Sequence, residues 1–192
     1  MNFIQAIILG IIEGVTEFLP VSSTGHLTIV EKLMGFKIDD PAITAFTAII
    51  QIGAIAAAVL YFRSDIIRIC KAWIGGVFSK AQRSNQDYRF GWAVILGSIP
   101  IAIVGLLFKN QIETTLRSLW FVAIGLLGWS LVMWVADRKT TARRSESATT
   151  WLDTIIIGLV QCVALIPGVS RSGATISAGL LRGFDRVAAT RL

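Results

Sequence analysis

The sequence is poor in charge, in cysteine and in histidine. Charged residues make up 16% of its 192 residues, whereas a soluble domain carries roughly a quarter. Its two cysteines, Cys70 and Cys162, lie far apart, which excludes a disulfide framework and a cysteine-based metal site. With 54% hydrophobic residues and a mean hydropathy of +0.70, the composition favours a polytopic membrane protein over a soluble protein with a large core.

The first segment also lacks the features of a signal peptide. No lysine or arginine precedes Lys32, so the positively charged region that opens a signal peptide is missing. Glu13 and Glu17 interrupt its apolar stretch. We therefore expect this segment to stay in the mature protein.

The longest apolar runs contain no charged side chain, and each is close to the roughly 20 residues that span a bilayer. They comprise residues 42–62, 91–108 and 119–136, and the first of them contains an amide, Gln51. Two further apolar stretches, residues 2–20 and 151–167, are shorter or interrupted by polar groups. The sequence thus predicts an all-α polytopic membrane protein.

The net charge of +6 is unevenly distributed between the spans. Six Lys/Arg lie within residues 63–90 and four within 137–150, whereas residues 31–41 and 109–117 hold two each. Cytoplasmic loops show this bias. We therefore expect both basic loops in the cytoplasm beside anionic lipid, and no nucleic-acid partner.

Two segments that begin 148 residues apart align without a gap. Residues 10–25, GIIEGVTEFLPVSSTG, match residues 158–173, GLVQCVALIPGVSRSG. Ser22 falls on Ser170, and Glu13 falls on a polar group of similar shape, Gln161. Chance similarity between two apolar segments is the alternative, and the matched polar positions argue against it.

The expected topology follows from the three spans between the copies. If the first copy returns to the side it entered, the second must enter from the opposite side, which gives an inverted-topology repeat. Pro20 and the pair Pro167-Gly168 would break each re-entrant helix near the bilayer midplane. A full-span first segment would instead give parallel copies. We expect one membrane domain, with a first repeat at 1–136, a basic linker at 137–150 and a second, incomplete repeat at 151–192.

The first copy carries two acids in an apolar setting. Glu13 and Glu17 are four residues apart, so they share a helical face and repel each other. Intramembrane acids mark functional sites by default. A divalent cation, an arginine or a shared proton would relieve the repulsion.

Past the break, hydroxyl groups and the single histidine follow closely. If a helix restarts there, its free N–H groups with Ser22, Ser23, Thr24 and Gly25 form a pocket for an anion. His26 lies three residues past Ser23, within reach as a base. These groups suit phosphoryl transfer, although Ser, Thr and Gly also serve as ordinary packing residues in membranes.

The second copy carries a guanidinium in an apolar run. Arg171 is well shaped to bind phosphate oxygens with two parallel hydrogen bonds, and a structural ion pair with Glu13 or Glu17 is the alternative. Ser23 falls on Arg171 in the alignment, so the copies have diverged there. Since specialised chemistry is expected where a repeat diverges, we predict Ser23 rather than Ser22 as the nucleophile.

EGVTEFLPVSSTGHL together with PGVSRSGAT resembles the undecaprenyl-diphosphate phosphatase family, also called bacitracin-resistance proteins. The resemblance covers essentially the whole chain. It implies hydrolysis of the C55 isoprenyl diphosphate on the outer face of the bacterial cytoplasmic (inner) membrane, which recycles the lipid carrier of cell-wall synthesis. It also implies a divalent cation, Mg²⁺ or Ca²⁺. The partners implied are the polyprenyl diphosphate lipid and the bilayer, and a homodimer stays open.

Residue by residue, the resemblance implies catalytic roles for Ser23, His26, Glu17, Glu13 and Arg171, and cation binding by Glu13 and Glu17. It implies substrate binding by Ser22, Thr24, Gly25, Ser170, Arg171, Ser172 and Thr175. Attack by Ser23 and direct attack by water both stay open. So does a rival class, a transporter or flippase for a prenyl phosphate lipid. Family members continue beyond the arginine motif, so we expect an incomplete chain that is weakly active alone.

Overall fold

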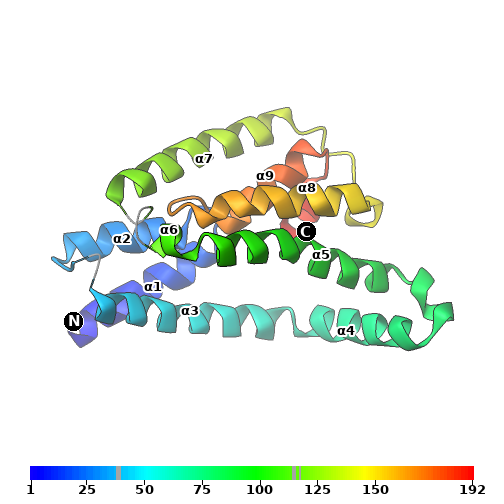
Figure 1. Cartoon of the computed structure of the whole chain (residues 1–192), viewed down its shortest axis with the longest axis horizontal. Coiled ribbons are helices and arrows are strands. Elements are labelled where there is room, and N and C mark those ends of the chain that lie inside the picture. The colour runs from blue at the N-terminus through cyan, green and yellow to red at the C-terminus, as the bar shows by residue number, and fades with distance from the viewer. Residues whose placement is uncertain (38–39, 114–115, 117) are drawn as a thin grey trace.

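The computed structural model describes residues 1–37, 40–113, 116 and 118–192. These residues form helices joined by loops, which confirms the all-α prediction (Figure 1). Arg117, counted above among the basic residues of the loop 109–117, lies outside the described residues. The helices are α1 (Phe3–Phe18), α2 (Ser23–Leu33), α3 (Pro41–Tyr61), α4 (Arg63–Phe78), η1 (Lys80–Ser84), α5 (Gln86–Leu107), α6 (Lys109–Glu113), α7 (Leu119–Lys139), η3 (Glu146–Ala148), α8 (Trp151–Gln161), η4 (Cys162–Leu165), α9 (Arg171–Leu181) and α10 (Arg186–Arg191).

Three helices, α3, α5 and α7, are long and apolar enough to cross a membrane, and they coincide with the three predicted spans. Two of them begin at a side-chain cap: Asp40 accepts a hydrogen bond from the Ala42 N–H before α3, and Asn85 does the same for Asp87 before α5. The basic residues Arg138 and Lys139 close the last turn of α7, where positive charge is favoured. The predicted multi-pass arrangement is therefore confirmed.

Each repeated segment forms a helical hairpin that breaks at its proline. The chain leaves α1 after Phe18 and resumes as α2 at Ser23, and it leaves η4 after Leu165 and resumes as α9 at Arg171. In Figure 1, α1 and α2 open toward the end where the N-terminus lies, whereas α8 and α9 open toward the opposite end. This is the relative orientation expected of an inverted repeat.

The two hairpins also share the same cap at equivalent positions. The Ser22 hydroxyl accepts a hydrogen bond from the Gly25 N–H at 3.2 Å, and the Ser170 hydroxyl accepts one from the Gly173 N–H at 3.1 Å. Ser170 and Gly173 each lie 148 positions after their counterparts Ser22 and Gly25, as in the repeat alignment. Ser22 has a positive φ of 68°, a conformation that a residue other than glycine adopts at a cost in free energy.

Glycines let the hairpin tips approach α7 closely. A Cβ atom added to Gly125 of α7 would lie 2.5 Å from the Pro167 carbonyl oxygen, and one added to Gly25 would lie 2.9 Å from the Leu126 side chain. Small residues permit this backbone approach between membrane helices. Helix α7 therefore lies against both hairpin tips.

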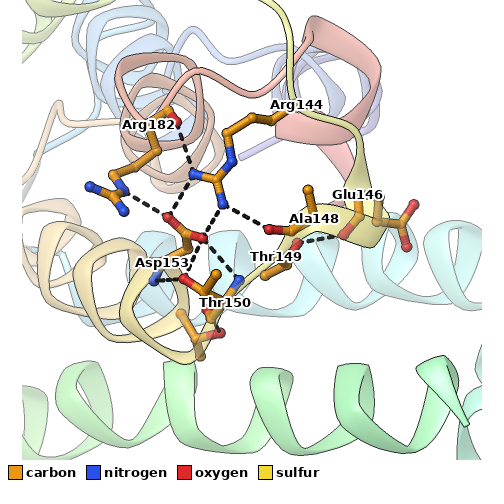
Figure 2. Close-up of polar contacts among 8 residues, drawn as sticks. Arg144, Glu146, Ala148, Thr149, Thr150, Asp153 and Arg182 are labelled. Atoms are coloured by element: carbon orange, nitrogen blue, oxygen red, sulfur yellow. Dashed lines mark hydrogen bonds and ion pairs between the residues drawn. The ribbon is translucent and has the colours of Figure 1, made fainter.

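A buried carboxylate fixes the second hairpin to the basic linker (Figure 2). The side chain of Asp153, at the first turn of α8, is fully buried and forms ion pairs with Arg144 at 2.5 Å and with Arg182 at 2.7 Å. Arg144 thus contacts a carboxylate, whereas the sequence predicted linker arginines beside lipid. Burial by itself would raise the pKa of the Asp153 carboxyl, but hydrogen bonds from Arg144, Thr150 and Arg182 outweigh it and hold the pKa below its usual range.

Candidate functional site

A cavity of about 380 Å³, named the main cavity because it carries most of the motif residues, lies between the two hairpins, α3 and α5. It brings together most of the residues that the sequence singled out. Its polar lining comprises Thr16, Glu17, Ser22, Ser23, Thr24, Gln51, Ser98, Thr149, Thr154, Gln161, Ser170, Arg171, Ser172 and Thr175. Glu17 of the acidic motif thus meets the serine-rich and arginine motifs at one place, although Glu17 and Thr175 lie 158 residues apart.

Two of the residues that line the cavity, Ser23 and Glu17, are joined by a short hydrogen bond. The Ser23 hydroxyl donates a hydrogen bond to Oε2 of Glu17 at 2.6 Å. This places a carboxylate acceptor on a hydroxyl at the start of a helix, the pairing that activates a serine nucleophile. Ser22, by contrast, uses its hydroxyl to cap α2. The geometry therefore favours Ser23 over Ser22 as the reacting hydroxyl.

Two helix N-termini face the same cavity. The first residues of α2, Ser23 and Thr24, and those of α9, Arg171 and Ser172, all line it. Backbone N–H groups in the first turn have no intrahelical partner and attract anions. The caps of Ser22 and Ser170 use the N–H groups of Gly25 and Gly173. The N–H groups of the two residues before each glycine stay available for an anion. This arrangement can bind a phosphate group from two sides.

Arg171 lines the cavity at the start of α9, and its side chain is exposed. Within the part of the chain that the structure describes, it forms no ion pair, so the predicted alternative of a structural pair with Glu13 or Glu17 is absent there. Ser170 and Ser172 lie 3.1 Å apart through their hydroxyl oxygens, and the Thr175 hydroxyl donates to the Ser172 carbonyl at 3.2 Å. Arg171 is therefore free to bind an anionic ligand.

Glu13 borders a different, smaller cavity of about 250 Å³. Its side chain is buried, with 2% of the residue exposed, and its Oε2 atom has no hydrogen-bond partner in the structure as described. Ser23, Thr24 and Gln51 line both cavities and form the wall between them. The two acids of the motif therefore point toward separate spaces.

This separation bears on the expected cation. The described residues include no group of three or more His, Cys, Asp and Glu side chains that could hold a metal ion. Glu17 is the carboxylate on the main cavity, and one of its oxygens already accepts the Ser23 hydroxyl. Of the two acids, only Glu17 lines the cavity that Arg171 also lines. Joint binding of Mg²⁺ or Ca²⁺ by Glu13 and Glu17 therefore stays a prediction.

His26 occupies a structural position in this geometry. Its Nδ1 atom lies 2.8 Å from the Ser22 carbonyl oxygen, and since a carbonyl accepts, Nδ1 carries the proton. His26 is not among the described residues that line the main cavity. The hydrogen-bond acceptor beside Ser23 is therefore Glu17, while His26 bonds the turn that precedes α2.

The two cavities extend toward opposite ends of the helices. The main cavity reaches Phe90, near the start of α5, and Thr149 of the linker, both next to the basic loops. The smaller cavity reaches Glu31 and Thr44, near the start of α3. The main cavity thus extends toward the end that carries the basic loops, which the sequence predicts to be cytoplasmic, and the smaller one toward the opposite end.

Sequence reasoning missed two amides of the main cavity, Gln51 and Gln161. Both left a signal in the sequence. Gln51 interrupts an otherwise apolar span, and Gln161 takes the place of Glu13 in the second copy. In the sequence alone, Gln51 reads as part of a span and Gln161 as support for the repeat.

A family profile described as "Bacitracin resistance protein BacA" matches residues 6–192. The chain belongs to this family. Among curated relatives, "Undecaprenyl-diphosphatase 3" of Frankia casuarinae is 67% identical over 192 residues, which cover 100% of this chain and 69% of that protein. "Undecaprenyl-diphosphatase" of Cutibacterium acnes is 62% identical, over 100% of this chain and 68% of that protein. The relative of the same name in Acidothermus cellulolyticus is 56% identical, over 100% of this chain and 69% of that protein. The predicted family is therefore confirmed.

Proposed function

We propose that this chain is an undecaprenyl-diphosphate phosphatase. It hydrolyses undecaprenyl diphosphate to undecaprenyl phosphate and inorganic phosphate, which recycles the lipid carrier for cell-wall synthesis and confers resistance to bacitracin. The observation that carries this proposal is the Ser23–Glu17 hydrogen bond on a cavity that also presents Arg171. Membership of the BacA family and relatives named as undecaprenyl-diphosphatases support it.

The head group enters the main cavity while the isoprenyl chain stays in the bilayer. Arg171 binds phosphate oxygens in two parallel hydrogen bonds, and the N–H groups at the starts of α2 and α9 bind further oxygens. Thr24 and Ser172 add hydroxyl donors at those two N-termini. Together these groups hold the terminal phosphorus near the Ser23 hydroxyl.

Chemistry then starts at Ser23. Its oxygen attacks the terminal phosphorus as Glu17 accepts the proton, and the bond from that phosphorus to the bridging oxygen breaks, which releases undecaprenyl phosphate. Water next attacks the phosphoseryl group, Glu17 returns the proton to Ser23, and inorganic phosphate leaves. In the variant, Glu17 activates water directly and Ser23 only positions it. A bound divalent cation would add charge stabilisation at the phosphate oxygens.

Release of inorganic phosphate from undecaprenyl diphosphate by the purified chain in detergent tests the activity. We expect release by the wild type and its loss in Arg171→Ala. Labelled terminal phosphate trapped on Ser23 after acid quenching would support the covalent path. Activity without any trapped label would support direct attack by water.

Transport of a prenyl phosphate lipid is a second candidate, favoured by one observation. Ser23, Thr24 and Gln51 form a shared wall between cavities that extend toward opposite ends of the helices, as in a transporter that is open alternately to each side. Phosphate release separates the two functions, because a transporter alone releases none. We place either activity in the bacterial cytoplasmic membrane.

A further inference from the structure

Two glutamine side chains line the main cavity from helices that do not carry the motif residues. Gln51 lies in the middle of α3, and Gln161 is the last residue of α8. Ser23 and Arg171 approach the same space from α2 and α9. Together with α1 and α5, which carry Glu17 and Ser98, six helices therefore contribute polar side chains to the cavity.

Both amides lack a hydrogen-bond partner among the residues that the structure describes. Most other polar side chains of the cavity are engaged locally. Ser98 donates to the Val94 carbonyl, Thr154 donates to the Thr150 carbonyl, and Ser22 caps its helix. Both residues are half-buried and border the cavity, and an amide that is buried without a hydrogen bond costs free energy. The partner of these amides is therefore to be sought inside the cavity.

The cavity lining offers few charged hydrogen-bond donors for the proposed head group. Arg171 is the cationic side chain among the described lining residues, and Glu17 offsets its charge. A diphosphate carries several negative charges. A second cation inside the membrane would be expensive, whereas a neutral carboxamide donates two N–H groups without that cost.

We propose that Gln51 and Gln161 bind the diphosphate head group through their carboxamide N–H groups. They are substrate-binding residues in addition to Ser23, Glu17 and Arg171. This inference rests on the proposed function, since it names further contacts of the same site. It also explains why an amide interrupts an otherwise apolar span.

The test measures binding and turnover in the same set of variants of the full chain in detergent. Gln51→Glu and Gln161→Glu replace donors with acceptors that repel phosphate, while Gln51→Leu and Gln161→Leu only remove the donors. Gln111→Glu, at an exposed position of α6, is the matched control. Calorimetry gives the Kd for inorganic pyrophosphate, and phosphate release from undecaprenyl diphosphate gives KM and kcat.

We expect each Glu variant to raise the Kd for pyrophosphate and the KM about tenfold or more, with kcat within about threefold of wild type. The Leu variants should show smaller rises, and Gln111→Glu none. If Gln51→Glu and Gln161→Glu bind pyrophosphate as tightly as wild type, or if wild type does not bind it, the inference is wrong. If wild type binds pyrophosphate but releases no phosphate, hydrolysis is refuted, and the Kd values alone decide the role of the amides. Should a Glu variant fail to fold, its Leu counterpart gives the deciding Kd.

Discussion

The hydroxyl of Ser23 donates a 2.6 Å hydrogen bond to Oε2 of Glu17, across the break between α1 and α2. The two residues are six positions apart, so the bond exists only because the chain turns at Pro20 and begins a new helix. The break that separates the helices therefore creates the contact on which the proposed chemistry depends.

Glu17→Gln should lower kcat about 10²–10⁴-fold, because an amide cannot accept the Ser23 proton. Ser23→Ala should be at least as damaging if Ser23 is the nucleophile. Steady-state phosphate release measures both. Ser130→Ala serves as the control, since Ser130 bonds only the Leu126 carbonyl of its own helix. A Glu17→Gln enzyme with wild-type kcat would rule out Glu17 as the base.

Arg171→Ala should lower kcat/KM at least about 100-fold, because a charged hydrogen-bond donor to phosphate is lost. Arg171→Lys should recover only part of that loss, since lysine cannot make two parallel bonds. Arg138→Ala, at the end of α7, is the control. Full recovery by lysine would show that charge alone matters at this position.

The cap residues can be tested by stability. Ser22→Ala should lower the free energy of unfolding by about 1–2 kcal/mol, because it removes the cap and keeps a side chain at a φ of 68°. Ser22→Gly should cost less, because glycine adopts that conformation freely. Thermal unfolding in detergent gives the comparison. Equal destabilisation by both changes would mean that the positive φ carries no penalty.

Asp153→Asn should destabilise the fold by about 3 kcal/mol, because it leaves two arginines around a buried uncharged amide. Asp137→Asn is the control: Asp137 forms a mostly exposed pair with Arg186, and such pairs contribute about 1 kcal/mol at most. The folded pKa of Asp153 lies below the ordinary value of 3.8. Its stabilisation is therefore complete above pH 4 or so and is lost as the pH falls through the folded pKa. The difference between wild type and Asp153→Asn should shrink in acid, and a constant difference down to unfolding would contradict the ion pairs.

Removal of divalent cations with EDTA should slow phosphate release about tenfold or more, and Mg²⁺ or Ca²⁺ should restore it, because a cation neutralises charge on the phosphate oxygens. Glu17→Gln should also weaken the dependence of the rate on cation concentration. An unchanged rate in EDTA would leave charge stabilisation to Arg171 and the helix N-termini.

The sequence predicted the spans and the hairpins well, because both depend on local signals. Charge-free runs of about 20 residues and prolines at matching places mark them directly. The repeat alignment also paired Ser22 with Ser170, and the two serines cap equivalent helices. The family assignment rested on two short motifs and is confirmed across the chain.

The relative placement of side chains was harder to predict. Helical spacing put Glu13 and Glu17 on one face, but Ser23, Thr24 and Gln51 come between the spaces that they border. The partners of Asp153 could not be read from the sequence, because Arg144 and Arg182 are 9 and 29 positions away. The proposed role of Gln51 and Gln161 likewise depends on which helices surround the cavity, and the sequence alone does not show that.

Helix α7 bears on the site although few of its side chains reach it. At Gly125 the backbone of α7 packs directly against the turn at Pro167 and Gly168. On the other side of this contact, a Cβ atom added to Gly168 would lie 2.2 Å from the Val122 carbonyl oxygen of α7. A single methyl group at either position would therefore act as a wedge and move Arg171 relative to Ser23. The distance between the Arg171 guanidinium and the Ser23 hydroxyl therefore depends on the absence of a side chain at Gly125 and Gly168.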